Sequence, residues 1–224
     1  MTSTGRLFIV ATPIGNPSDI TLRALEILRS VDCVICEEIR EGSSLLKKLG
    51  VTPRELIALN EHNEQQQAAD IVMRLLNQQD LALISDCGTP VFADPGHYLV
   101  QQVTDVGIPV VPIPGPSSLM AALSLLDFNL TRFVFGGFLP REPELRRREL
   151  MRLRGLGMPV VLMDTPYRLG SLLDDLAKTF GKGQPIVLAC DLTLPGEKVY
   201  RGSVSEVRQQ VNQRKAEFIL VVKV

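Results

Sequence analysis

Tryptophan is absent from this 224-residue chain, and aromatic residues make up only 5% of it. So few rings disfavour a surface on which successive bases of a single strand would stack. Charge of one sign is lacking too, because 24 Lys and Arg residues against 25 Asp and Glu residues leave a net charge of −1. No field of the whole protein attracts nucleic acid, and any contact with RNA must use a local basic patch.

Cysteine and histidine are too sparse for a disulfide scaffold or a zinc site, since the chain has four cysteines and two histidines. Cys33 and Cys36 form a C-x-x-C pair inside an apolar run. On a strand, residues three apart point to opposite faces, so we expect these thiols to be buried separately. We expect no metal.

Long hydrophobic runs are also missing. The first apolar run has five residues, at 7–11, which is too short for the core of a signal peptide. No run approaches the ~20 residues that a membrane-spanning helix needs. The sequence therefore predicts a cytoplasmic protein that does not contact a membrane.

What the sequence does contain is an alternation of short apolar runs with amphipathic segments. The first half predicts strands at 7–11, 33–36, 56–59, 81–85 and 110–113, with helices at 18–31, 43–49, 64–77 and 98–106. These strands are apolar throughout, which is typical of a parallel sheet covered by helices on both faces.

The second half has a different pattern. It predicts strands at 132–135, 160–163, 186–190, 198–201 and 218–222, with helices at 117–126, 146–153, 169–180 and 205–212. The last three strands need not all be parallel, so we expect a mixed sheet. A proline-rich stretch at 112–116 predicts a linker between an N-terminal α/β domain, residues 1–113, and a C-terminal α/β domain, residues 117–224.

Common phosphate-binding and nucleophile motifs are absent: the chain has no G-x-G-x-x-G after the first strand, no P-loop and no G-x-S-x-G. Instead, three loops rich in Gly and Pro each follow a predicted strand, at 12–16, 85–96 and 114–118. In a parallel sheet these loops meet at the carboxyl ends of the strands, where ligands bind. Ordinary turn chemistry is the alternative explanation for any one of them.

Several short segments have distinctive sequences: TPIGN at 12–16, DITLRAL at 19–25, EHNE at 61–64, SDCGTP at 85–90, DPG at 94–96, PIPGPSS at 112–118 and GFLP at 137–140. Together they resemble the tetrapyrrole-methylase superfamily, and within it the group that methylates ribosomal RNA of the small subunit. The resemblance extends from residue 7 to EFILVV at 217–222. It implies two α/β domains with a cleft between them, S-adenosylmethionine (SAM) as cofactor, a homodimer, and 2′-O-methylation of a cytidine in small-subunit (16S) rRNA.

The resemblance also implies which residues bind SAM. The residues that would contact its methionine part are Pro13, Cys87, Gly88, Thr89, Phe92, Ser117 and Ser118, and those on its adenosine side are Met163, Asp164 and Leu192. Serines at the start of a helix are suited to binding a carboxylate, although Ser117 could instead be a plain helix cap. Met163 and Leu192 could equally be core residues.

A ribose hydroxyl is a poor nucleophile, so we expect a base or hydrogen-bond acceptor to assist it. Glu37, Glu38, Glu61 and His62 are candidates, and we favour Glu61 and His62 because they follow a strand on the presumed ligand edge. The alternative is a polar helix N-terminus in which Asn60 or Asn63 is the cap.

One local basic patch exists in this near-neutral chain. Arg146, Arg147 and Arg148 lie in a predicted helix, and Arg40 and Arg168 follow other strands. We expect these five arginines to contact the RNA backbone. Interspersed glutamates support the alternative that the helix is simply solvated, and Arg40 and Arg168 could be ordinary ion-pair partners.

Two other functions stay open on the sequence. The chain could be a methyltransferase of the same fold that acts on a small molecule such as a tetrapyrrole, or a SAM-binding protein without catalysis. Transfer of a labelled methyl group to small ribosomal subunits would separate the first function from the other two.

Overall fold

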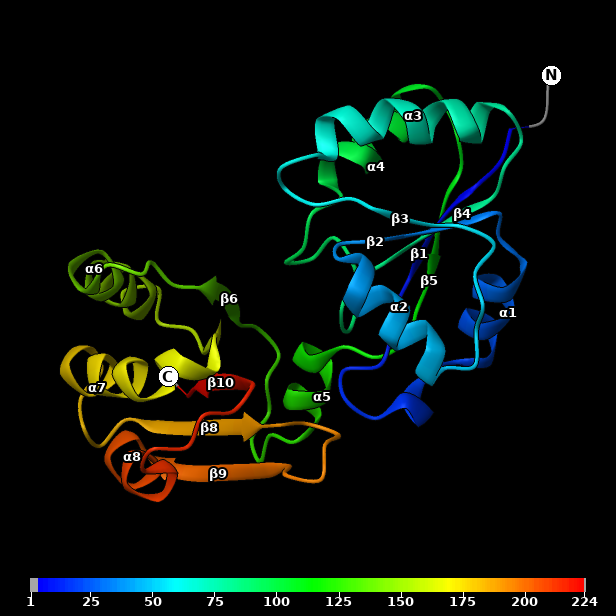
Figure 1. The fold of residues 1–224 in the computed structure, drawn as a ribbon. Coiled ribbons are helices and arrows are strands. Elements are labelled where there is room, and N and C mark those ends of the chain that lie inside the picture. The colour runs from blue at the N-terminus through cyan, green and yellow to red at the C-terminus, as the bar shows by residue number, and fades with distance from the viewer. Residues whose placement is uncertain (1–3, 224) are drawn as a thin grey trace. The chain divides into compact units, whose positions relative to one another are not determined.

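The computed structural model describes residues 4–223, which divide into two compact units. One unit ends at Ser117 and the other begins at Ser118. Each unit is built on one five-stranded sheet with helices packed against it (Figure 1). Across residues 4–223, every helix is too short or too polar to cross a membrane.

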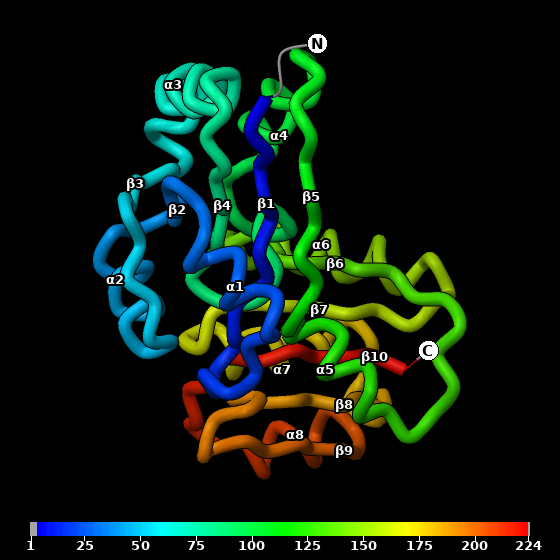
Figure 2. The backbone as a smooth tube through the Cα atoms, turned by 90° about the vertical axis from the view of Figure 1, so that its right-hand side faces the viewer, coloured from blue at the N-terminus to red at the C-terminus, as the bar shows by residue number. Residues whose placement is uncertain are grey.

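The first unit contains a fully parallel sheet. Its strands are β1 (Leu7–Val10), β2 (Cys33–Cys36), β3 (Leu56–Ala58), β4 (Leu81–Ile84) and β5 (Val110–Ile113). They lie side by side in the order β3-β2-β4-β1-β5, as Figure 2 shows. All four pairings are parallel, so the predicted parallel sheet is confirmed.

Helices cover both faces of this sheet. α1 (Leu22–Ser30) and α2 (Ile39–Lys48) pack on one face, and α3 (Glu64–Leu76) and α4 (His97–Asp105) pack on the other (Figure 1). Because successive strand residues point to opposite faces, Cys36 joins the α1–α2 core and Cys33 joins the α3–α4 core. The expected separation of the two thiols is confirmed.

The chain order creates a switch point in the sheet. β1 and β4 are neighbours, yet β1 leads to α1 on one face and β4 leads to α4 on the other. The two following loops diverge there, and such a point at the carboxyl ends of parallel strands is where α/β proteins bind ligands. We call this region the carboxyl edge of the first sheet.

Two helix starts in the first unit differ from the prediction. A 3₁₀ turn, η1 (Pro17–Asp19), precedes α1, whose cap is Thr21: its Oγ1 accepts a hydrogen bond from Ala24 N at 3.1 Å. α2 begins at Ile39 rather than near residue 43. Gly42 disfavours a helix by propensity, but a Cβ there would lie 2.6 Å from Cys36 Sγ, so close packing on the sheet requires glycine.

The second unit contains the expected mixed sheet. Its strands are β6 (Val134–Phe138), β7 (Val160–Asp164), β8 (Pro185–Cys190), β9 (Lys198–Ser203) and β10 (Phe218–Val222), in the order β6-β7-β10-β8-β9. The β6–β7 pairing is parallel and the other three are antiparallel. β10 therefore starts at the edge where β7 and β8 end.

Three helices of the second unit share one core with the sheet: α6 (Pro143–Arg154), α7 (Leu169–Thr179) and α8 (Val204–Val211). The short α5 (Ser118–Ser124) precedes β6, and a 3₁₀ turn, η2 (Pro166–Arg168), joins β7 to α7. α8 begins with a capping box, in which Ser203 and Glu206 each satisfy the other's backbone amide.

The position of β6 corrects the predicted strand at 132–135. The strand continues through Gly136 and Gly137 to Phe138, with a bulge between Phe135 and Gly137. A Cβ on Gly136 would lie 2.7 Å from Leu162 Cδ2, so the glycine permits packing against the next strand. Glycines inside a strand mark a bulge or a close approach, and here they mark both.

Candidate functional site

The three loops predicted to meet at the carboxyl edge of the first sheet do meet there. Thr12, just after β1, forms a two-way backbone bridge with Gly88: Thr12 N donates to Gly88 O at 2.8 Å, and Gly88 N donates to Thr12 O at 3.1 Å. The third loop joins through Thr89, whose Oγ1 donates to Pro116 O at 3.3 Å. Three segments far apart in sequence thus form one connected surface, and the prediction of their convergence is confirmed.

The loop after β4 has an unusual backbone. Gly88 has φ +79°, and a Cβ there would lie 3.3 Å from Ile14 Cγ2. Val91 has φ +71°, a conformation that costs a β-branched residue free energy and that persists chiefly in ligand-binding segments. The loop is therefore held in a shape that its sequence alone does not favour.

The expected cofactor residues of the first unit lie on these three loops. Pro13 and Gly88 are buried, Cys87 and Thr89 are exposed, and Phe92 is half exposed. Ser117 ends the third loop and Ser118 begins α5.

Carboxyl groups follow two adjacent strands at the same edge. Glu37 comes directly after β2, and Asp86 and Asp94 belong to the loop after β4. Burial, then the charges of Asp86 and Asp94, raise the pKa of Glu37 above its ordinary value. Burial also raises the pKa of Asp94 and of Asp86, with neighbouring carboxylates adding to both shifts. Groups of this kind hold protons more readily than exposed acids and are suited to proton transfer.

Glu37 is among the bases expected from the sequence, whereas Asp86 and Asp94 are not. The available signal was an acidic residue shortly after each of two strands, but the sequence does not say that β2 and β4 are neighbours.

No set of three or more His, Cys, Asp and Glu side chains within residues 4–223 is arranged to hold a metal ion.

Glu61 and His62, the favoured catalytic pair, lie after β3 at the outer edge of the sheet. Their side chains are 81% and 85% exposed, and His62 Nε2 is 3.6 Å from Glu61 Oε1. β2 stands between β3 and β4, so the pair lies farther along the sheet from the Thr12–Gly88 bridge than Glu37 does. The structure places Glu61 and His62 one strand beyond Glu37, and the charge of Glu61 acts on Glu37 together with the charges of Asp86 and Asp94.

The polar residues around that pair order the turn between β3 and α3 and the start of α4. Asn63 Oδ1 accepts from Asn60 N at 2.8 Å, and Asn60 Oδ1 accepts from His62 N at 3.1 Å. Glu64 Oε1 accepts from the backbone amides of Tyr98 and Leu99 at 3.0 and 3.2 Å, so it caps α4 from the start of α3. Asn63 occupies the N-cap position of α3, as the helix-cap alternative has it, but its side chain makes no capping hydrogen bond to that helix.

In the second unit, the remaining expected cofactor residues share one edge of the sheet. Met163 and Asp164 end β7, and Leu192 follows β8. Cys190 and Asp164 both pair with Phe218 at the start of β10. We call this the Asp164 edge. Leu192 is 9% exposed, as the core alternative also allows.

Asp164 has an unusual feature for a buried carboxyl. Its Oδ1 accepts from Thr165 N at 2.8 Å and lies 3.2 Å from Arg168 Nη1, while Oδ2 is buried and finds no hydrogen-bond partner among the described residues. Burial raises its pKa, against the lowering effects of Thr165 and Arg168. A buried acceptor without a donor is costly, so this oxygen suits a ligand that supplies one. The hydroxyls and amino group of an adenosine do so.

Arg168 is used within the protein rather than left for a substrate phosphate. Its Nη2 donates to Leu139 O at 3.0 Å and to Pro140 O at 2.7 Å, and its Nη1 pairs with Asp164. The guanidinium thus ties the loop after β6 to η2. The geometry favours the ordinary ion-pair alternative for Arg168.

The arginines of α6 divide into different roles. Arg146 is buried: its Nε and Nη2 both lie 2.7 Å from Asp175 Oδ2, and its Nη1 donates to Arg141 O at 3.0 Å. It is therefore unavailable to RNA, contrary to expectation, because α7 packs over it. Arg147 pairs with Glu144, and Arg148 is exposed with no ion pair among residues 4–223. Arg40, in the first turn of α2, is also exposed.

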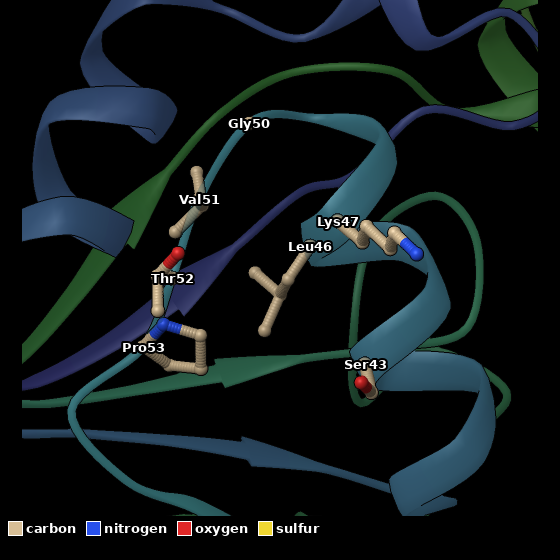
Figure 3. A pocket seen from close by; sticks show the side chains of 7 residues that line it. All are labelled: Ser43, Leu46, Lys47, Gly50, Val51, Thr52 and Pro53. Atoms are coloured by element: carbon tan, nitrogen blue, oxygen red, sulfur yellow. The ribbon is translucent and has the colours of Figure 1, made fainter.

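A separate hollow lies beside the end of α2 (Figure 3). Its lining residues come from α2 and from the segment leading to β3: Ser43, Leu46, Lys47, Gly50, Val51, Thr52 and Pro53. This segment precedes β3, so the hollow faces the edge of the sheet opposite the three joined loops. Its polar side chains are those of Ser43, Lys47 and Thr52, and none of the expected cofactor or substrate residues lines it.

Comparison with known proteins adds the family. Residues 6–208 match the model of the Tetrapyrrole (Corrin/Porphyrin) Methylases. The chain is 40% identical over 225 residues to ribosomal RNA small subunit methyltransferase I of Escherichia coli O157:H7, covering 99% of this chain and 78% of that protein. It is 42% identical over 227 residues to the protein of the same name from Xylella fastidiosa (strain Temecula1 / ATCC 700964), covering 100% and 83%.

A solved structure shows the same fold. Uroporphyrin-III C-methyl transferase from Thermus thermophilus, crystallised with S-adenosyl homocysteine, matches with a TM-score of 0.67 at 16% identity and covers 98% of this chain and 97% of its own. The expected fold class is thereby confirmed. The chain belongs to the tetrapyrrole methylase family, and within it to the methyltransferases named ribosomal RNA small subunit methyltransferase I.

Proposed function

We propose that this protein is a SAM-dependent methyltransferase that methylates the 2′-hydroxyl of a cytidine in small-subunit (16S) rRNA. The observation that carries the proposal is identity of 40–42% along essentially the whole chain to relatives named for methylation of that RNA. The joined loops at the carboxyl edge of the first sheet support it, because they form a rigid surface where α/β proteins bind ligands.

In the first unit, the cofactor contacts would come from the three joined loops. The positive φ of Val91 in the loop after β4 supports this assignment, since such strained residues cluster in ligand-binding segments. Pro13, Cys87, Thr89 and Phe92 would contact the methionine part, together with the hydroxyl groups of Ser117 and of Ser118, the first residue of the second unit.

In the second unit, Asp164 would bind the adenosine part through its Oδ2, which accepts no hydrogen bond from the described residues. Arg168 would position this carboxylate by holding its other oxygen. Met163 and Leu192 would supply apolar contacts beside it. SAM supplies a methyl group activated by a positively charged sulfur, and the protein has to align the acceptor oxygen with it and exclude water.

A proton acceptor would assist the ribose hydroxyl. Glu61 and His62 remain candidates, and Glu37 is the stronger one because it is partly buried, has a raised pKa and lies next to the loop after β4. The RNA backbone would be bound by Arg40, Arg147 and Arg148. Arg146 and Arg168 are left out of this set, since each of their guanidinium groups binds a buried carboxylate and a backbone carbonyl oxygen of the second unit. Arg147 has only a surface ion pair with Glu144.

We also propose that the protein forms a homodimer, as the resemblance to the superfamily implies. Sedimentation equilibrium across a concentration series measures this directly. A mass of 24.7 kDa at all concentrations would refute it.

The decisive experiment is methyl transfer to small ribosomal subunits isolated from cells that lack this activity. Purified protein and tritiated SAM should label the RNA, and digestion to nucleosides should yield 2′-O-methylcytidine. Parallel reactions with a uroporphyrinogen test the small-molecule alternative, and SAM binding by calorimetry tests the non-catalytic one. Labelling of the macrocycle alone, or binding without transfer, would refute the proposed function.

A further inference from the structure

The second unit exposes an aromatic ring at the Asp164 edge. Tyr167 lies in η2, three residues after Asp164, and is 78% exposed. Lys215, just before β10, places its ammonium 4.8 Å from the centroid of that ring. In a chain with only 5% aromatic residues, this ring is open to solvent yet already has a cation at its face.

The ring is attached to a rigid part of the backbone. Pro166 restricts the turn, Thr165 N donates to Asp164 Oδ1, and Arg168 N donates to Thr165 O at 2.9 Å. The guanidinium of Arg168 then ties η2 to the carbonyl groups of Leu139 and Pro140. Binding of a partner that stacks on Tyr167 would therefore cost little conformational entropy, because the segment that carries the ring is already ordered.

A second exposed ring lies at the end of the neighbouring strand, β6. Phe138 ends β6, pairs with Met163 of β7 and is 53% exposed. It directly precedes the two carbonyl groups that Arg168 binds. The bulge in β6 and the positive φ of Gly137, +58°, re-aim the strand just before this ring.

We propose that Tyr167 and Lys215 bind an unpaired nucleotide of the RNA substrate, with its base stacked on the tyrosine ring and its phosphate paired with the ammonium. Phe138 extends the stacking surface. This inference rests on the proposed function, because it deepens the description of the RNA substrate.

The chemistry of the pair fits single-stranded RNA better than a duplex. Unpaired bases stack on Tyr and Phe rings, whereas a duplex hides its base faces. The cation provides a salt-sensitive contact to the backbone. The pair adjoins Asp164, which is proposed to hold the adenosine of SAM, so a nucleotide bound here lies beside the cofactor.

The test compares Tyr167→Ala with Tyr167→Phe. We expect Tyr167→Ala to weaken binding of small-subunit rRNA by about 5- to 100-fold, the range that base–aromatic stacking produces. Tyr167→Phe should stay within about twofold, because the ring is kept. Lys215→Gln should lower the slope of log affinity against log salt by close to one contact.

Phe133→Ala is the matched control. Phe133 is 37% exposed and directly precedes β6, so it lies at the end of that strand away from Phe138. It should bind RNA as the wild type does. All variants should keep the wild-type SAM affinity, measured by calorimetry. The Tyr167 and Lys215 variants should also keep the wild-type melting temperature, because these two side chains are exposed.

The outcomes separate the two proposals. If the wild type methylates rRNA and Tyr167→Ala has an unchanged KM and Kd for it, the stacking role is refuted and the proposed function stands. If Tyr167→Ala loses SAM affinity to the same extent as RNA affinity, Tyr167 acts on the cofactor and the inference is wrong. If the wild type methylates no RNA, the proposed function fails and this inference fails with it.

Discussion

The buried ion pair between Arg146 and Asp175 gives a sharp prediction about stability. The two side chains are 7% and 6% exposed, and two guanidinium nitrogens approach one carboxylate oxygen at 2.7 Å. Arg146→Ala would leave the Asp175 carboxylate buried with only Lys178, at 3.8 Å, as a cationic neighbour. Removing one partner of such a pair costs about 3–5 kcal/mol, since the remaining charge is desolvated without compensation.

Guanidinium-induced unfolding followed by circular dichroism measures the effect. Arg148→Ala is the matched control on the same helix and should change the free energy of unfolding by less than about 0.5 kcal/mol, as exposed substitutions do. The double variant Arg146→Met, Asp175→Leu should recover most of the lost stability, because apolar residues of similar volume replace buried pairs at little cost. An Arg146→Ala variant as stable as Arg148→Ala would refute this account of the pair.

Three further predictions concern the first unit. Glu37→Gln should lower kcat by about 100- to 10,000-fold with SAM affinity unchanged. The wild-type rate should fall as the pH is lowered, because a protonated Glu37 cannot accept a proton. The midpoint of this fall should lie above the ordinary glutamate pKa of about 4.3, because the pKa of Glu37 is raised. A wild-type acid limb at that ordinary value, or full activity in Glu37→Gln, would exclude Glu37 as the base. Gly88→Val should reduce SAM affinity at least about tenfold by calorimetry, because the new side chain meets Ile14 and disfavours φ +79°; unaltered affinity in a folded variant would place the cofactor elsewhere. Glu64→Ala should cost about 1 kcal/mol in chemical unfolding, since the amides of Tyr98 and Leu99 lose their acceptor, whereas Gln65→Ala should be neutral; equal stability of these two variants would rule out the cap.

Most of the strands could be predicted because their residues are apolar on both faces. β2 and β10 have the predicted bounds, and their residues are buried throughout. The apolar sequence pattern predicts element bounds less well where a glycine, and not a large apolar side chain, fills the contact between two elements. Gly42 in α2 and Gly136 in β6 both allow a neighbouring element to approach, and at both places the predicted bounds were wrong.

The candidate site could be predicted only as far as its loops. Residues that follow parallel strands meet at one edge whatever the strand order, so the contact of Thr12 with Gly88 was within reach of the sequence. The roles of single arginines could not be predicted from the sequence. Arg146 and Arg148 are two residues apart in one helix, and only the packing of α7 determines that one is buried and the other exposed. Packing alone likewise leaves Asp164 Oδ2 without a hydrogen-bond partner among residues 4–223.

The reciprocal bridge of Thr12 and Gly88 has a consequence for how these loops move. It adds one antiparallel rung beyond the last pairing of β1 with β4, so it closes the tip of an otherwise parallel sheet. Neither loop can move outward without breaking both backbone hydrogen bonds between Thr12 and Gly88. The amide hydrogens of Thr12 and Gly88 should accordingly exchange slowly with solvent and at one common rate, set by opening of the end of the sheet. Two loops that moved independently would instead exchange at two different rates.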